Sequence, residues 1–180
     1  MNLPTQRLSV LVGAALLAAA ASDSAQTVRI ANQGDALSLD PHSLNESLQL
    51  SVDSNAYEAL VGWNKKLEMV PMLATSWKQA SPTVWRFELR KGVQFHDGTP
   101  FTADDVLFTL GRIMADGSDM KSYGTDIKDS RKIDDHTIEI ETKAPQPILP
   151  QILSQVYVMS KKCCEANHAP TPADRRTRVP

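Results

Sequence analysis

The hydrophobic pattern of residues 71–114 changes its period partway along, and this change constrains the fold more than any other feature of the chain. Between residues 85 and 90, apolar and charged side chains alternate, which is typical of a strand with one buried and one solvent-facing side. A turn is expected at Lys91 and Gly92. Farther along, the apolar side chains instead recur on one face of a helix: Val106, Leu107, Leu110, Ile113 and Met114.

The predicted helix carries signals at both ends. Thr102 with Asp105 three residues later makes a weak form of capping box, and Phe101 can pack across the cap. Arg112 lies toward the other end, where a cation suits the helix dipole, and Gly117 follows. The helix is therefore expected to begin after Thr102 and to stop just before Gly117.

Two interpretations exist for the pair His96 and Asp97. Val93 and Phe95 resume the strand alternation just before the pair. In one interpretation, His96 acts as a base or metal ligand and Asp97 is the carboxylate that orients it. However, Asp97 precedes Gly98, and an aspartate in such a tight turn commonly bonds its own backbone. The sequence places no serine, cysteine or second histidine to complete a triad or a zinc set. We therefore interpret the pair as part of a turn.

The remaining elements are predicted from the same two periods. A second helix is predicted after residue 46, where Leu48, Val52 and Leu60 lie on one face. The expected elements are strands at 27–32, 127–133, 137–142 and 156–159, helices at 47–60 and 147–154, a short hairpin at 63–69 and a loop at 116–124.

Charge and composition exclude some classes of partner. The 180 residues include 21 acidic and 19 basic side chains, so the net charge of −2 gives no electrostatic case for nucleic acid or an anionic membrane. Hydrophobic residues make up 42% of the chain, which is enough for a core. The length suits one domain with a removable segment.

Residues 1–25 have the features of a secretory signal peptide. Arg7 precedes an uncharged run over residues 8–21 that is too short to span a bilayer comfortably and ends in small residues. Cleavage is expected after residue 21, 24 or 25. A buried amphipathic helix is disfavoured because the run is apolar on all sides. With no cysteine near the cleavage region, we expect a free periplasmic protein in a host with two membranes.

The two cysteines of the chain, Cys163 and Cys164, are neighbours. A disulfide between neighbours would close a strained ring. With His168 they supply only three of the four ligands of a structural zinc site. We interpret both as incidental thiols, and expect no metal and no cofactor.

Three ordered motifs support a resemblance to a known family. They are LRKG at 89–92, FHDG at 95–98 and FTADDV at 101–106. In this order they closely resemble the solute-binding proteins of peptide and nickel ABC importers, known as extracellular solute-binding family 5. The resemblance extends more loosely from about residue 27 to about residue 162.

The resemblance implies a fold of the α/β class, a mixed α+β lobe that forms the N-terminal part of a two-lobe periplasmic binding protein of type II. It divides the chain into the signal peptide at 1–25, an incomplete N-terminal lobe at 26–162, and a truncated linker at 163–180. Members of the family are more than twice as long, so we expect the chain to be a truncated form.

The resemblance also implies a function and a site. Family members close two lobes around a peptide or other small solute and deliver it to the permease subunits of an ABC importer. The residues expected to contact the ligand are Leu44, Asn45 and Glu46, with a looser alignment placing an aromatic contact at Tyr123. The acidic residue that anchors a peptide's amino terminus in the family lies in the second lobe. We expect a monomer without catalytic residues.

Two alternatives stay open. The chain could be a secreted hydrolase that uses His96 and Asp97, or a truncated binding module that does not take part in transport. The solute could be a peptide, a nickel complex, an oligosaccharide or an opine-like compound, and peptide is the default.

Overall fold

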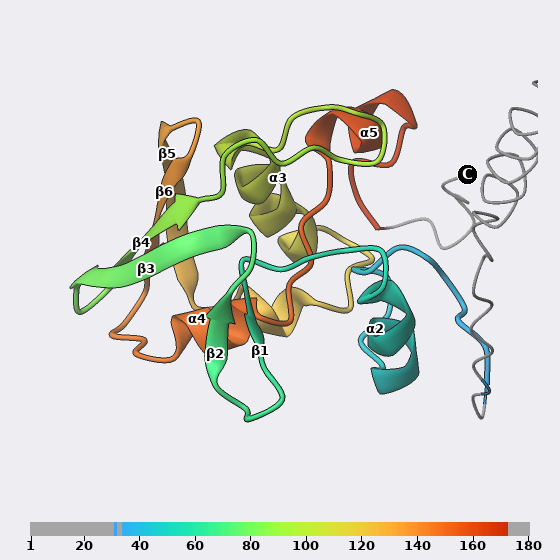
Figure 1. Cartoon of the computed structure of the whole chain (residues 1–180), viewed down its shortest axis with the longest axis horizontal. Coiled ribbons are helices and arrows are strands. Elements are labelled where there is room, and N and C mark those ends of the chain that lie inside the picture. The colour runs from blue at the N-terminus through green and yellow to red at the C-terminus, as the bar shows by residue number, and fades with distance from the viewer. Residues whose placement is uncertain (1–30, 32–33, 173–180) are drawn as a thin grey trace, which may run out of the picture. The chain divides into compact units, whose positions relative to one another are not determined.

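The computed structural model describes residue 31 and residues 34–172, and Figure 1 shows their arrangement. The predicted signal peptide lies outside the described residues, as does the predicted strand at 27–32 apart from Ala31. Residues 34–172 belong to one compact unit that begins at Gly34. Within residues 34–172, no helix is both long and apolar enough to cross a bilayer.

A four-stranded antiparallel sheet lies at one side of this unit, at the left in Figure 1. Its strands lie in the order β3 (Ala74–Ser81), β4 (Val84–Leu89), β6 (Thr137–Thr142) and β5 (Ile127–Asp134). Strand β4 and the hairpin of β5 and β6 confirm the predicted alternation. Strand β3 was not predicted, because most of its side chains are exposed and polar and so give no apolar period.

The two faces of the sheet differ in chemistry. On the inner face, Trp77 on β3, Phe87 on β4 and Ile138 on β6 are cross-strand neighbours, and the last two are fully buried. On the outer face, the Glu139 carboxylate accepts hydrogen bonds from the Nε atoms of Arg86 and Arg131 on the flanking strands, each at 2.9 Å. The core therefore lies on one side of the sheet only.

Helix α3 (Ala103–Met114) contributes to the core beside β5. Val106, Leu110 and Ile113 are buried in the core, as the sequence predicted. The capping box is confirmed: the Asp105 carboxylate accepts a hydrogen bond from the Thr102 backbone N–H at 2.9 Å.

The shorter elements lie around this core. Strands β1 (Val61–Trp63) and β2 (Met69–Pro71) pair antiparallel and confirm the hairpin predicted at 63–69. The helix predicted at 147–154 is α4 (Leu149–Leu153), and the loop at 116–124 includes one 3-10 turn, η1 (Lys121–Tyr123). Helix α5 (Lys161–Ala166) was not predicted, and it spans the boundary expected between lobe and linker at residue 162.

The helix predicted at 47–60 is wrong in its length and in its buried face. Helix α2 (Ser47–Asp53) ends seven residues early, because the Glu58 carbonyl accepts the Val158 N–H and Ala59 pairs with Tyr157. Its buried residues are Gln49 and Asp53, joined by a hydrogen bond of 2.9 Å, whereas Leu48 and Val52 are only half-buried. Pairing with a distant segment therefore outweighs continuation of the helix.

The strand predicted at 156–159 is also wrong, since only a single bridge forms there. Two of its backbone groups bond to side chains instead: the Met159 N–H donates to Thr109 Oγ1 at 3.0 Å, and the Tyr157 carbonyl accepts from His42 at 2.9 Å. Because these groups are already satisfied, a partner strand is not needed.

The strand expected at Val93 and Phe95 reduces to one bridge within a local turn. The Phe95 N–H donates to the Thr99 carbonyl, and the Val93 carbonyl accepts from Phe101. The turn itself is as predicted, because Gly98 has φ +79°.

Candidate functional site

The loop predicted to contact solute leads into α2. Leu44 is half-buried, whereas Asn45 and Glu46 are exposed. Glu46 is the N-cap residue of α2, yet its side chain makes no cap hydrogen bond. Its carboxylate therefore remains on the surface beside Asn45, where it can accept hydrogen bonds from another molecule.

The structure brings two of the predicted contacts together across a long sequence separation. Tyr123, in the last position of η1, donates from its hydroxyl to Asn45 Oδ1 at 3.5 Å, although the two residues are 78 positions apart. Asn45 is exposed, so its amide nitrogen can also donate to another molecule. Asn45, Glu46 and Tyr123 thus form a small polar surface that we call the Asn45 surface.

The loop that carries Tyr123 is attached directly to the loop that carries Asn45. The Asp119 backbone N–H donates to the His42 carbonyl at 3.1 Å. The buried Met120 lies next in the chain and bonds through its N–H to Ser118 Oγ at 3.1 Å. Gly124 follows Tyr123, and a Cβ atom there would lie 2.5 Å from Met114 Sδ, so glycine allows η1 to pack closely on α3.

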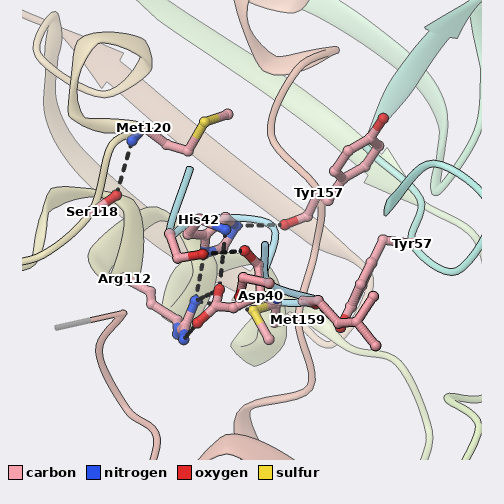
Figure 2. A network of polar contacts seen from close by, with 11 residues as sticks. Asp40, His42, Tyr57, Arg112, Ser118, Met120, Tyr157 and Met159 are labelled. Atoms are coloured by element: carbon pink, nitrogen blue, oxygen red, sulfur yellow. Dashed lines mark hydrogen bonds and ion pairs between the residues drawn. The ribbon is translucent and has the colours of Figure 1, made fainter. Parts of the chain in front are cut away.

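A buried arginine of α3 binds the loop at 40–42, which leads to Asn45 (Figure 2). The Arg112 side chain is completely buried, and its guanidinium group binds the Asp40 carboxylate in bidentate fashion, with Nη1–Oδ1 of 2.8 Å and Nη2–Oδ2 of 2.6 Å. Nη1 also lies 3.0 Å from His42 Nδ1 and 3.1 Å from Met159 Sδ. We call Asp40, His42 and Arg112 the Arg112 cluster.

Burial and charge set the protonation of this cluster. Burial and the neighbouring Arg112 charge lower the pKa of His42 to about 4, so the ring is neutral near pH 7. His42 Nε2 donates to the Tyr157 carbonyl, which leaves Nδ1 as the acceptor for Arg112. Burial opposes ionisation of Asp40, but the hydrogen bonds and charge of Arg112 outweigh it and hold the pKa of Asp40 below its usual value.

The role of Arg112 was not predicted from the sequence, where its expected part was only that of a cation that suits the helix dipole. A signal was present: Asp105, Thr109 and Arg112 recur at helical spacing, adjacent to the apolar face of α3. All three are buried, and each bonds to the segment at 157–161 or to the loop at 40–42. We call these three residues the polar stripe of α3.

A cavity of about 570 Å³ lies elsewhere in this unit. Segments 54–58, 93–97 and 158–169 line it, and the residues of the Asn45 surface are not among its lining. The exposed His96 and Asp97 lie at this cavity, but Asp97 Oδ1 accepts from both the N–H and the hydroxyl of Thr99, at 2.9 and 2.6 Å. The geometry therefore assigns Asp97 to its own turn.

Both cysteines line the same cavity as free thiols. Cys164 is buried on α5, and burial raises its pKa to about 11, so it is not a thiolate near neutral pH. In the part of the chain that the structure describes, no group of three histidine, cysteine, aspartate or glutamate side chains could hold a metal ion.

The family is decided by residues 68–177, which match the model of bacterial extracellular solute-binding proteins, family 5 (Middle). This chain belongs to that family. A glutathione-binding protein, GsiB of Pectobacterium atrosepticum, is 33% identical over 111 residues, which cover 60% of this chain and 22% of GsiB.

Solved structures of periplasmic binding proteins share the fold. Helicobacter pylori DppA in complex with the peptide STSA superposes with a TM-score of 0.64 at 27% identity, covering 76% of this chain and 32% of DppA. Burkholderia pseudomallei OppA superposes with a TM-score of 0.71 at 22% identity, covering 76% of this chain and 31% of OppA. The mixed helix and sheet fold is therefore that of periplasmic binding proteins, and the chain spans less than a third of the length of each of these three relatives.

Proposed function

We propose that this chain forms one wall of the solute site in the substrate-binding component of an ABC importer, and that the solute is a peptide. The observation that carries this proposal is the Asn45 surface, where three residues expected to contact ligand lie together on loops from distant parts of the chain. Membership of the family and the peptide-bound relative DppA support the same class of ligand.

The chemistry of the Asn45 surface suits a peptide backbone. The amide of Asn45 can donate to a peptide carbonyl, and the Glu46 carboxylate can accept from a peptide N–H or an ammonium group. Tyr123 offers a ring that can pack on an apolar side chain beside its hydroxyl. Such contacts recognise the backbone of the peptide and not particular side chains, which is the usual way to bind peptides of varied sequence.

The test is a titration of the full chain with candidate ligands, in which NMR amide shifts report binding. This method is suited to weak binding. The ligands are the tetrapeptide STSA, reduced glutathione and a nickel–histidine complex. We expect STSA to shift the amides of Asn45, Glu46 and Tyr123, at concentrations up to about 10 mM because only one wall of the site is present. The preferred ligand among the three decides the solute class.

A matched pair of variants locates the binding surface. Asn45→Ala is expected to weaken STSA binding, whereas Asn55→Ala, an exposed asparagine that lines the 570 Å³ cavity, is expected to leave it unchanged. If none of the ligands shifts the three amides, or if only Asn55→Ala weakens binding, the proposal is wrong.

The proposal extends to the setting in which the chain acts. It includes a periplasmic location, a monomeric state and transfer of the solute to a membrane permease. Membership of the family and the predicted signal peptide support it. Fractionation of the host cell and cross-linking to the permease subunits test these three points.

A further inference from the structure

We infer that Arg112 is a positioning residue for solute binding: through Asp40 and His42 it holds the Asn45 surface in its binding geometry. This inference rests on the proposed function of the Asn45 surface. It concerns a residue that is itself fully buried and does not touch that surface, so it assigns Arg112 a role beyond the stability of the core.

The first step is the attachment of the loop at 40–43. Arg112 binds Asp40 through its two terminal nitrogens, Nη1 and Nη2. The Asp40 carbonyl in turn accepts hydrogen bonds from the Ser43 N–H at 3.1 Å and from the Ser43 hydroxyl at 2.8 Å. Asp40 Oδ1 also accepts from the His42 N–H at 3.0 Å. The turn directly before Leu44 and Asn45 is thus closed around the carboxylate that Arg112 holds.

The second step links this turn to the loop of Tyr123. His42 is fixed on one ring nitrogen by Arg112 and on the other by the Tyr157 carbonyl. Its own carbonyl accepts the Asp119 N–H, four residues before Tyr123. The loops that carry the two halves of the Asn45 surface are therefore joined through His42. Figure 2 shows His42 bonded to both Arg112 and the Tyr157 carbonyl.

The third step concerns the choice of arginine. The planar guanidinium group contacts the Asp40 carboxylate, His42 Nδ1 and Met159 Sδ from one rigid fork. Neither lysine nor an apolar side chain can make this set of directed contacts. Stability alone does not need the ion pair, since buried pairs can often be replaced by uncharged residues of similar volume without loss.

This difference separates positioning from simple stabilisation in an experiment. The double variant Asp40→Asn, Arg112→Met removes both charges, so no unpaired buried charge remains, yet it cannot hold His42. Arg86→Met serves as the matched control, because Arg86 is also an ion-paired arginine but lies on the outer face of the sheet. Each full-length variant is compared with the parent by urea unfolding, by hydrogen exchange of the Asp119 amide and by STSA titration.

We expect the double variant to unfold near the parent's urea midpoint. Its Asp119 amide should exchange at least about tenfold faster, and its Kd for STSA should rise about tenfold, which corresponds to the loss of one or two hydrogen bonds. The control should keep the parent's exchange and Kd. Parent-like exchange and Kd in a stable double variant would overturn the inference.

Two further outcomes are also decisive. If the double variant does not fold, Arg112→Lys replaces it, because lysine keeps the charge beside Asp40 but cannot also reach His42 in the same geometry; parent-like Asp119 exchange in that variant would contradict the inference. If the parent binds none of the three ligands, the proposed function fails, and the Asp119 exchange rates alone then decide whether Arg112 positions the two loops.

Discussion

The two buried sides of α3 hold the molecule together by different physics. Its apolar face, with Val106, Leu110 and Ile113, packs into the core beside the sheet. Its polar stripe bonds to the segments at 40–42 and 157–161, neither of which is a strand of the sheet. Apolar packing is non-directional and responds gradually to changes in volume, whereas the hydrogen bonds of the stripe join particular atoms.

This comparison shows how a small lobe can hold irregular loops firmly. The segment at 157–161 forms no strand, yet its N–H groups at Met159 and Lys161 are satisfied by Thr109 and Asp105. Side chains of α3 therefore accept the backbone N–H groups of this segment, as the carbonyl groups of a neighbouring strand would in a sheet. If this is correct, substitutions in the stripe should cost more than comparable substitutions in the apolar face.

The largest effect is expected for Arg112→Met. The Asp40 carboxylate would be left buried without its cation, at a cost of about 3–5 kcal/mol in the free energy of unfolding. Urea unfolding followed by tryptophan fluorescence measures this loss, and the Asp40→Asn, Arg112→Met double variant should recover most of it. A loss below about 1 kcal/mol, as for a surface ion pair, would show that substitutions in the stripe cost no more stability than substitutions in the apolar face.

The next largest effect is expected from pH, through His42. Its pKa of about 4 in the folded chain lies below the ordinary value of 6.5, so the unfolded chain binds a proton first as the pH falls. Stability should be full above pH 6.5 and should decline by about 3 kcal/mol as the pH falls from 6.5 to 4.

Unfolding measured over this pH range in two glutamine variants identifies the group. His42→Gln should flatten the decline, because the glutamine amide does not titrate, whereas His96→Gln should leave it in place because His96 is exposed. An unchanged decline in His42→Gln would assign it to other groups.

A smaller effect is expected for Thr109→Val, which keeps the shape of the side chain but removes its oxygen. The buried Met159 N–H would lose its acceptor, which costs about 1–3 kcal/mol. Thr75→Val is the control, since the Thr75 hydroxyl bonds at an exposed position. Equal unfolding free energies for the two variants would contradict a special role for the stripe.

The smallest effect is expected on the apolar face. Ile113 is fully buried, and Ile113→Val removes one methylene group at a cost of about 0.5–1.5 kcal/mol. Calorimetric unfolding of this variant beside Thr109→Val compares the two sides of α3 directly. A larger loss for Ile113→Val than for Thr109→Val would reverse the comparison.

Local patterns explain which parts of the fold could be predicted. The capping box at Thr102, the turn at Gly98 and the hairpin of β5 and β6 depend on residues close in sequence, and all three are present. Strand β3 was missed because an exposed edge strand has little hydrophobic period, and α2 was overextended because apolar spacing alone does not reveal a competing distant partner.

The candidate site also has features that the sequence predicted and features that only the structure shows. The choice of Leu44, Asn45, Glu46 and Tyr123 came from the family resemblance, and it stays a prediction until binding is measured. That Asn45 and Tyr123 lie within 3.5 Å follows only from the folded loops. Arg112 could have been suspected from its helical spacing with Thr109, but its partners Asp40 and His42 could not.

The sequence by itself determined the family, through ordered motifs at 89–106, and the elements whose signals are local. Only the tertiary structure decided that Arg112 forms one cluster with His42 and Asp40, which lie 70 and 72 positions before it. The physical reason is that a polar contact requires particular atoms at particular distances and angles, and the positions of those atoms depend on the path of every loop between them.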